Sequence, residues 1–581
     1  MKKLVALILS LCLLTGALTA AFAEAAPAEQ QSRHYGLEYT FYVLDEDPDF
    51  MPKTLLFFFD GVDDLPWLDV EELCDILVSL QHRVFKQPDY DLTYEADENT
   101  VVLRRENNFY MVLNYDENQI AFNDYNAFVK DPTAISLIDQ LSHTGFNDAG
   151  EPYLFQRDLV ASFDRCGDVK RLYLGDYNIQ LISENGRFYI PLQTANDFLF
   201  APMFARSILF NGQAMFLARA QELFNFDDVE PTALGRIYYS AEPTQRSQEL
   251  ADFGYNELSL MMDSLYGMKK QHDIGDFGRM FWQIGFDEAL DSTNPRDADQ
   301  ALKNFISYYL DDLHSAFSLA SWMTGLEFID SETGPSSRHD KQQTKKYEQL
   351  RKQGMGEDWQ SYQEVGNTAY ITFDEFFLKN KVDYYADGAK DELIPDTIGL
   401  IIYAHQQIYR EGSPIENVVI DLSNNFGGTA DAAVFLISWI LGEAEISIED
   451  TYTGAQSTLV YRADVNLDRQ FDEQDTLADK HVYCLISPVS FSCGNLVPSV
   501  CKYHQAVTLI GRTSGGGACA VQRVSTAWGS MFQISGTSRL SFRKNGSFYD
   551  IDGGVEPDIY IDHLETLYDR EALTNLINGL N

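Results

Sequence analysis

The sequence predicts a mixed α/β fold in its C-terminal part, preceded by a β-rich N-terminal region. Residues 36–240 are rich in Tyr, Phe and Asp and contain short alternating apolar runs, such as 100–103, that indicate strands. Residues 245–320 carry apolar side chains spaced by three and four, which is typical of amphipathic helices. From residue 368 onward, strand-like and helical patterns alternate, and this alternation favours a sheet with parallel crossovers.

Length and charge narrow the range of functions. The chain has 581 residues, of which 45% are hydrophobic and 23% charged, as expected for a globular protein of several domains. Lys and Arg number 43 against 88 Asp and Glu, so the formal net charge is −45. Such a surface would repel a phosphate backbone, so we expect no nucleic acid as a partner. The same charge suits a well-solvated secreted protein.

The N-terminus has the layout of a cleavable export signal. Two lysines precede an apolar stretch at 4–14, which is followed by small residues ending at Ala23. We therefore predict a signal peptide at 1–23, a linker at 24–35, and a secreted, extracytoplasmic protein. The apolar stretch is shorter than the roughly 20 residues of a membrane span, and we expect no transmembrane segment after signal removal.

Two larger regions are predicted after the linker. Residues 36–240 form the β-rich region, in which hairpin patterns at 92–113 and 177–192 suggest two small modules. Residues 241–581 form the second domain, which opens with a helical lead-in at 245–320.

Within the second domain the expected elements follow one another along the chain. A polar, Lys-rich stretch at 338–356 is expected as an exposed loop or helix. Strands or helices are predicted at 368–373, 417–422, 429–441, 482–486, 496–503 and 507–510. Six cysteines remain after signal removal, which is too sparse for a disulfide framework, and their pairing is left open.

A strand that ends in two glycines is the first candidate site. The apolar run 418–422 leads to Gly427-Gly428, and Thr429 is placed to cap the following helix. Glycines at such a turn let backbone N–H groups approach an anion closely. By itself, a turn of this kind is as well explained by backbone geometry alone.

A serine between a strand and a helix is the second candidate site. The run 482–486 ends in a Ser-rich stretch at 487–495 that leads into a helix. Ser492 would lie near helix N–H groups that can stabilise an oxyanion, so it is our candidate nucleophile. The structural alternative is that Ser490 or Ser492 only caps the helix.

Together these segments resemble the C-terminal processing peptidase family, also called tail-specific proteases. The matching pieces occur in the family's order at 421–428, 490–495, 511–517, 522 and 553–558. The resemblance extends over roughly 245–562 and implies a tail-specific protease type of fold and a serine peptidase that hydrolyses polypeptide substrates. No cofactor is then required for the chemistry. The resemblance also implies an oxyanion hole made by the backbone N–H of Cys493 and of Gly427 or Gly428.

The family contains branches with different bases. Members with a Ser/Lys dyad carry a lysine in the Gly-rich loop, but no lysine occurs at 511–522 here. The sequence is more similar to the tricorn-core-like branch, in which a histidine beside a serine provides the base, and 311–317 fits that piece. The resemblance then implies His314 as general base and Ser315 as its neighbour. A serine hydroxyl needs such an adjacent base to attack a carbonyl.

The carboxylate that orients the histidine is less well defined. The glutamate of that branch, which precedes the 553–558 piece, is absent here. Asp552 is the nearest acid, and Asp550 is the second choice. Either residue is also suited to a simple turn.

An acidic loop predicts a structural calcium site inside the second domain. Oxygen-bearing side chains recur with EF-hand-type spacing at Asp464, Asn466, Asp468, Gln470, Asp472 and Asp475. Arg469 replaces the usual Gly, and an Asp stands at the last position in place of Glu, so binding would be weakened. The alternative is a solvated acidic loop without a metal.

Two other functions stay open at this stage. The first is a catalytically inactive ligand-binding or peptide-binding protein on the same fold, because the family's lysine and glutamate are both absent. The second is an esterase of the α/β-hydrolase type that uses Ser492 with His563. The N-terminal region is suited to selecting substrate, binding cell wall or covering the active site.

Overall fold

The computed structural model describes residues 33–37, 40–43, 55–59, 64–84, 87–106, 108–129, 154–157, 162–165, 167–326, 334–379, 382–386 and 393–580. The predicted signal peptide at 1–23, most of the predicted linker and Cys166 lie outside these residues. None of the described helices has the length and the apolar character needed to cross a membrane.

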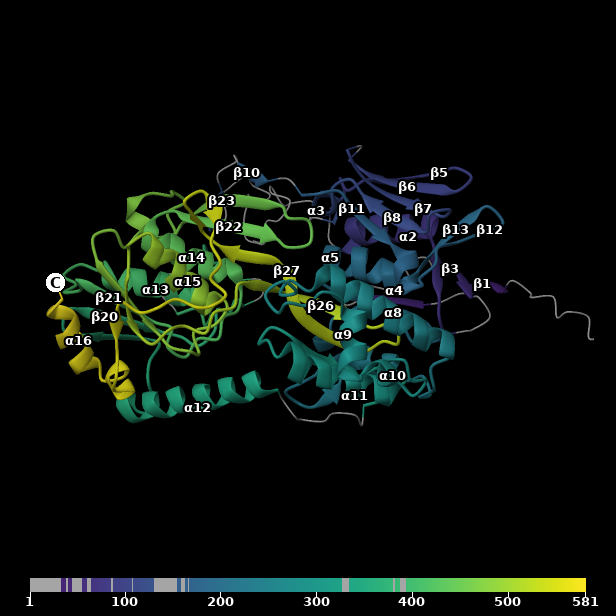
Figure 1. The fold of residues 1–581 in the computed structure, drawn as a ribbon. Coiled ribbons are helices and arrows are strands. Elements are labelled where there is room, and N and C mark those ends of the chain that lie inside the picture. Colours follow the sequence, from purple (N-terminus) through teal and green to yellow (C-terminus); the bar gives the residue numbers. More distant parts are fainter. Residues whose placement is uncertain are drawn as a thin grey trace, which may run out of the picture.

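A six-stranded sheet with helices on both faces forms the centre of the C-terminal part (Figure 1). Its strands, in spatial order, are β19 (Tyr362–Val365), β20 (Thr368–Thr372), β21 (Asn417–Asp421), β24 (His481–Ile486), β25 (Thr508–Gly511) and β30 (Ile559–Tyr560). All neighbours from β20 to β30 are parallel, and β19 adds an antiparallel edge. The predicted α/β fold is confirmed.

Alternate residues of the central strand explain the two helical layers. Val418 and Ile420 of β21 pack in one hydrophobic cluster, and Val419 packs in another. The first cluster includes α13 (Thr397–Ile408), α14 (Ala430–Leu441) and α15 (Cys493–Tyr503). The second includes α12 (Pro335–Met355) and α16 (Arg570–Asn578). Because both faces are covered, the middle residues of β21 are apolar on both sides of the sheet.

A second, seven-stranded sheet connects this part to the rest of the molecule. Its long strand β27 (Met531–Ser541) pairs with β26 (Cys519–Ser525), β22 (Ala444–Asp450) and β18 (Ala316–Leu319). Further strands are β23 (Gln456–Ala463), β9 (Phe155–Arg157) and β10 (Ser162–Arg165). In Figure 1, β27 runs between the six-stranded sheet and the N-terminal region.

The N-terminal region is rich in strands, as predicted. One five-stranded sheet contains β1 (Arg33–Leu37), β3 (Leu55–Phe59), β4 (Trp67–Asp69), β13 (Arg187–Pro191) and β12 (Ile182–Glu184). A second contains β11 (Lys170–Tyr173), β8 (Gln119–Phe122), β7 (Phe109–Asn114), β6 (Thr100–Arg105) and β5 (Leu92–Ala96). A three-stranded sheet contains β14 (Ser207–Phe210), β15 (Ala214–Ala218) and β2 (Thr40–Val43).

The helical lead-in packs against the N-terminal region. Its main helices are α8 (Gln248–Leu265), α9 (Phe277–Ile284) and α11 (Pro295–Phe305). One hydrophobic cluster contains Phe198 of the N-terminal region, Leu258 of α8 and Phe532 of β27. The N-terminal region, the lead-in and the β26–β27 hairpin therefore share one core.

Shorter elements complete the fold. They are α2 (Val70–Ser79), η2 (Leu80–Val84), α3 (Tyr125–Val129), η3 (Leu174–Tyr177), α4 (Leu192–Ala195), η4 (Asn196–Phe200), α5 (Ala201–Phe204), α6 (Ala220–Leu223), β16 (Phe224–Asn225), β17 (Glu230–Pro231), α7 (Ala233–Tyr238), α10 (Asp287–Leu290), η5 (Ile306–Leu310), η6 (Glu473–Asp475), β28 (Arg543–Lys544), β29 (Ser547–Phe548) and η7 (Leu564–Leu567). The polar stretch 338–356 lies almost entirely within α12. The described cysteines, Cys74, Cys484, Cys493, Cys501 and Cys519, are buried free thiols.

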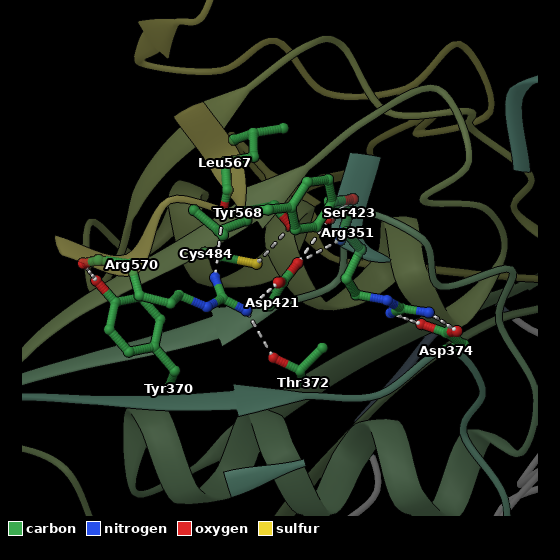
Figure 2. A network of polar contacts seen from close by, with 11 residues as sticks. Arg351, Tyr370, Thr372, Asp374, Asp421, Ser423, Cys484, Leu567, Tyr568 and Arg570 are labelled. Atoms are coloured by element: carbon green, nitrogen blue, oxygen red, sulfur yellow. Dashed lines mark hydrogen bonds and ion pairs between the residues drawn. The ribbon is translucent and has the colours of Figure 1, made fainter. Parts of the chain in front are cut away.

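A buried ion pair fixes the carboxyl end of β21 (Figure 2). Asp421 Oδ2 accepts a hydrogen bond from Arg570 Nη2 over 2.7 Å, and their side chains are 1% and 5% exposed. The other carboxylate oxygen accepts from the Ser423 hydroxyl over 2.6 Å. Arg570 also donates to Thr372 Oγ1 on β20 over 3.0 Å. The start of α16 is thereby tied to the ends of two central strands.

The Asp421–Arg570 pair should contribute strongly to stability. We expect Asp421→Ala to lower the free energy of unfolding by about 3–5 kcal/mol, because it leaves the Arg570 charge buried without its partner. Urea unfolding followed by circular dichroism measures this change. The control is Glu95→Ala, which removes the exposed ion pair between Glu95 and Arg104 and should have little effect. Equal losses in the two variants would contradict the assignment.

Candidate active site

The two sequence motifs meet at the carboxyl ends of β21 and β24. These strands are parallel and in register, with Asp421 opposite Leu485. The turn after β21 therefore lies beside the turn after β24. The backbone N–H of Phe491 donates to Asn425 O over 3.1 Å and joins the two turns directly.

Two serine side chains strengthen the connection between these turns. Ser490 Oγ donates to Leu422 O over 2.7 Å. Ser487 Oγ donates to Ser423 O over 2.5 Å. Both hydroxyls are buried and use their protons in these two hydrogen bonds, which position the turn. Ser490 therefore does not cap the helix.

Ser492 lies directly before α15 in an unusual backbone conformation. Its φ is 55° and its ψ is −120°, a combination that is sparsely populated by residues other than glycine and is common at functional sites. Its backbone N–H donates to Gly516 O over 2.9 Å, in the predicted Gly-rich stretch. Its side chain makes no helix-capping hydrogen bond. The Ser492 hydroxyl therefore does not cap the helix, which was the structural alternative considered from the sequence.

The backbone N–H groups near Ser492 differ in whether they already donate a hydrogen bond. Gly427 N already donates to Asn425 Oδ1 over 2.9 Å. Among the described residues, the N–H groups of Gly428 and Cys493 have no acceptor. Cys493 is the first residue of α15, and N–H groups at this position have no partner within a helix. Of the two glycine alternatives, Gly428 has the donor that is available to an oxyanion.

Glycine is required at both positions of the Gly427-Gly428 turn. Gly427 has a φ of 104°, and a Cβ there would lie 2.6 Å from Ser492 Cβ. Gly428 has a φ of 131°, and a Cβ there would lie 2.2 Å from Phe376 O. A side chain larger than hydrogen at either position would therefore displace the turn that contains Ser492 or the loop after β20.

His314 is held in a buried position between η5 and β18. Only 7% of its surface is exposed, and its ring lies 4.6 Å from the Phe491 ring. Burial lowers the pKa of the imidazole, and the carboxylates of Asp312 and Asp552 offset part of this shift. The neutral imidazole, which is the form that a general base requires, therefore predominates at pH 7.

One cavity of about 690 Å³ brings Ser492 and His314 together. Ser315, Gly428 and Cys493 line it as well. In the part of the chain that the structure describes, no hydrogen bond joins the Ser492 hydroxyl to the His314 ring. In enzymes without bound substrate, catalytic hydrogen bonds are often long and tighten only when substrate binds.

Asp552 and Asp550 differ in their surroundings. Asp552 lines an adjoining cavity of about 530 Å³ that also contains His314, and its Oδ1 accepts from Ala518 N over 3.0 Å. Asp550 is engaged in an ion pair with Arg539. Of the two, only Asp552 acts on the pKa of His314. The geometry thus favours the first of the two predicted acids.

Asp312 is a site residue that sequence reasoning missed. Its carboxylate accepts from the backbone N–H groups of His314 and Ser315, each over 2.9 Å. It also accepts from the hydroxyls of Ser315 and Tyr266, each over 2.7 Å, and of Ser535 over 2.9 Å. Asp312 therefore holds the loop that presents His314, and the Ser315 hydroxyl is directed to this carboxylate. The only sequence signal was an acid two residues before the histidine.

The predicted calcium loop is internally hydrogen-bonded. Asp464 is buried, and its carboxylate accepts from the N–H groups of Asp468 and Arg469 and from the Tyr385 hydroxyl. Asp475 accepts from the N–H groups of Val465, Asn466 and Asp472. Among the described residues, no cluster of three or more His, Cys, Asp or Glu side chains is arranged to hold a metal ion. Calcium binding stays a prediction.

Comparison with known families supports a peptidase. Residues 367–561 match the model of peptidase family S41. The match contains Ser492, Gly428, Cys493 and Asp552, whereas His314 lies before it. The resemblance seen in the sequence is thus supported by this peptidase family model over residues 367–561. No curated protein matches the chain.

Several solved structures are similar to parts of the chain. A protein from Parabacteroides merdae, described as a candidate peptidase, aligns at 14% identity over 57% of this chain and 96% of its own length, with a TM-score of 0.40. A photosystem II D1 C-terminal processing protease aligns at 19% identity over 36% of this chain and 46% of its own, with a TM-score of 0.27. The tricorn protease aligns at 10% identity over 85% of this chain and 46% of its own, with a TM-score of 0.28. The chain thus matches less than half the length of these last two proteins.

The close contact between Gly427 and Ser492 can be tested directly. We expect Gly427→Ala to abolish labelling of Ser492 by a fluorophosphonate probe, because the added methyl group must displace the serine. The control is Gly412→Ala, which also has a positive φ of 74° but has open space around a Cβ. It carries the same kind of backbone strain and should keep full labelling. Equal labelling of the two variants would contradict the proposed contact.

Proposed function

We propose that the protein is an exported serine endopeptidase in which Ser492 is the nucleophile and His314 is the general base. The observation that carries the proposal is that both residues line one cavity, beside the two unoccupied N–H groups of Gly428 and Cys493. A nucleophile, a neutral base and an oxyanion site are the three parts that acyl transfer requires.

The chemical steps follow from these positions. His314 removes the proton from the Ser492 hydroxyl as the oxygen attacks the scissile carbonyl, and the N–H groups of Gly428 and Cys493 stabilise the oxyanion. The imidazolium then gives its proton to the leaving amine, and an acyl-enzyme is formed. A water molecule, activated by the same imidazole, hydrolyses the ester and releases the serine. Asp552 and Asp312 stabilise the imidazolium through their negative charge.

A Ser/His mechanism is favoured over a Ser/Lys dyad. No lysine occurs at 511–522, and none of the described residues that line the cavity of Ser492 is a lysine. The only strongly basic side chain in that lining is Arg523, which stays protonated and is unsuited to be a base. The proposal that the protein is exported rests on the signal-like pattern at its N-terminus. The proposal of a structural calcium ion rests on the acidic loop that begins at Asp464.

A binding protein on the same fold is the second candidate. It is favoured by the absence of a hydrogen bond between the Ser492 hydroxyl and the His314 ring among the described residues. It is opposed by the unoccupied N–H groups at Gly428 and Cys493, which a binding protein does not need.

Labelling with a fluorophosphonate probe separates the two candidates. We expect the mature protein to form one adduct at Ser492, identified by mass spectrometry, both with and without added calcium. Ser492→Ala should lose the adduct and reduce peptide hydrolysis by about 10⁴-fold or more. Ser337→Ala is the matched control, because this serine lines the same cavity and should leave labelling intact. A wild-type protein without an adduct would favour the binding protein.

The pH dependence reports on the environment of His314. Activity requires the neutral imidazole, so kcat/KM should rise with pH through the pKa of His314. Because burial lowers this pKa, the midpoint of the rise should lie below about 6.5, the usual histidine value. Asp312→Asn removes a negative charge that raises the pKa, so the midpoint should move further down.

Asp340→Asn is the control for this measurement. Asp340 lines the same cavity but is not among the groups that shift the pKa of His314. The midpoint of the pH profile of Asp340→Asn should equal that of the wild type. A midpoint for Asp312→Asn that stays in place or moves up would remove Asp312 from the proposed charge arrangement.

A further inference from the structure

Arg523 lies in the wall of the cavity that contains Ser492. It belongs to β26 and is paired with Gln533 of β27, which is itself paired with Ala316 of β18. Cross-strand partners point to the same face of a sheet, and all three of these residues line the cavity. The guanidinium of Arg523 therefore extends from the face of the sheet that borders the nucleophile.

Arg523 forms no direct ion pair with an acidic side chain among the described residues. No hydrogen bond or ion pair is formed by its side chain within the described part of the chain. Burial lowers the pKa of the guanidinium, and the positive charge of Arg206 acts in the same direction, against the carboxylate of Glu222. Arg523 is partly exposed and borders the cavity, so its guanidinium can donate hydrogen bonds to an anion that arrives from outside.

Two arginines of the N-terminal region, Arg206 and Arg219, lie near enough to Arg523 for their charges to act on one another. Arg206 donates to both carboxylate oxygens of Glu222, over 3.1 Å and 2.8 Å. Arg219 lies 3.5 Å from the same carboxylate. The Glu222 carboxylate thus contacts Arg206 and Arg219, whereas it forms no ion pair with Arg523. Three arginines are thus grouped around Glu222 in a chain whose net charge is −45.

The acidic residues of the cavity do not cancel this charge. Asp312 and Asp340 also line the cavity, but they come from the loop before His314 and from α12. The Asp312 carboxylate is already occupied by the hydrogen bonds that hold the His314 loop. Neither residue forms an ion pair with Arg523 in the described structure.

We propose that Arg523, with Arg206 and Arg219 beside it, binds a carboxylate of the polypeptide substrate close to the bond that is cleaved. The inference rests on the proposed peptidase function and names its substrate class. An arginine binds a carboxylate through two parallel hydrogen bonds, which gives both energy and orientation. The carboxylate belongs either to an Asp or Glu side chain or to the C-terminus of the substrate. In both cases the N-terminal region takes part in selecting the substrate.

Paired peptides test this inference. Cleavage sites are first mapped on an unfolded protein, and quenched fluorescent peptides are then made with Glu or Gln at each position around the cleaved bond. Each peptide is also made with a free and with an amidated C-terminus. Within a pair, we expect kcat/KM of the wild type to be about tenfold or more higher for the peptide that carries the carboxylate. Arg523→Gln should abolish the difference, and Arg523→Lys should restore part of it.

A matched control separates a local from a general charge effect. Arg236→Gln removes the same charge from an exposed arginine of the N-terminal region, whose guanidinium contacts only Pro231 O in the contacts described. This variant should keep the full preference. Preference for Glu over Gln assigns a side-chain carboxylate, and preference for a free over an amidated end assigns the C-terminus. Absence of both preferences, or their persistence in Arg523→Gln, overturns the inference.

The proposed function and the inference fail in different ways. Arg523→Gln should still be labelled at Ser492 by the fluorophosphonate probe, because Arg523 takes no part in the acyl transfer. Binding of the same peptides to Ser492→Ala, measured by fluorescence anisotropy, does not depend on catalysis. Labelling without any carboxylate preference removes the inference alone. Carboxylate binding that depends on Arg523, without labelling or cleavage, removes the peptidase and keeps the binding site.

Discussion

The hydrogen bonds that join the turns after β21 and β24 are the constraint on which the candidate site depends. Parallel pairing aligns the ends of the two strands, and the bond from Phe491 N to Asn425 O connects the turns themselves. The hydroxyl of Ser490 adds a second link to the first turn. The strained backbone of Ser492 persists because these contacts determine it from both sides. Without them, Ser492 and the Gly428 N–H would not line one cavity.

Charge around His314 is balanced between burial and nearby acids. Burial lowers the pKa of the imidazole, whereas the carboxylates of Asp312 and Asp552 act in the opposite direction. The two acids act from different places. Asp312 holds the backbone of the histidine loop, and Asp552 lines the adjoining cavity. A base kept neutral at pH 7, with negative charge close enough to stabilise its protonated form, is suited to proton transfer.

Local sequence patterns predicted the parts of the site that one strand and one turn determine. An apolar run followed by serine and then by a helix was sufficient to place Ser492 and Cys493 in a strand-to-helix turn, which exposes helix N–H groups wherever it occurs. The occupied donor at Gly427 could not be predicted, since it depends on the rotamer of Asn425. The function of Asp312 depends on Tyr266 and other residues far away in the sequence, so its position alone did not reveal it.

The sequence by itself determined the α/β fold of the C-terminal part, the β-rich N-terminal region and the strand-to-helix turn that contains Ser492, because periodicity and turn residues are local properties of a chain. Only the tertiary structure decided which residues surround that turn. The β26–β27 hairpin shares its core with the N-terminal region, and this packing puts Arg206 beside Arg523 at the cavity of Ser492. Such proximity results from long-range packing between segments that are distant in sequence, and no local pattern encodes it.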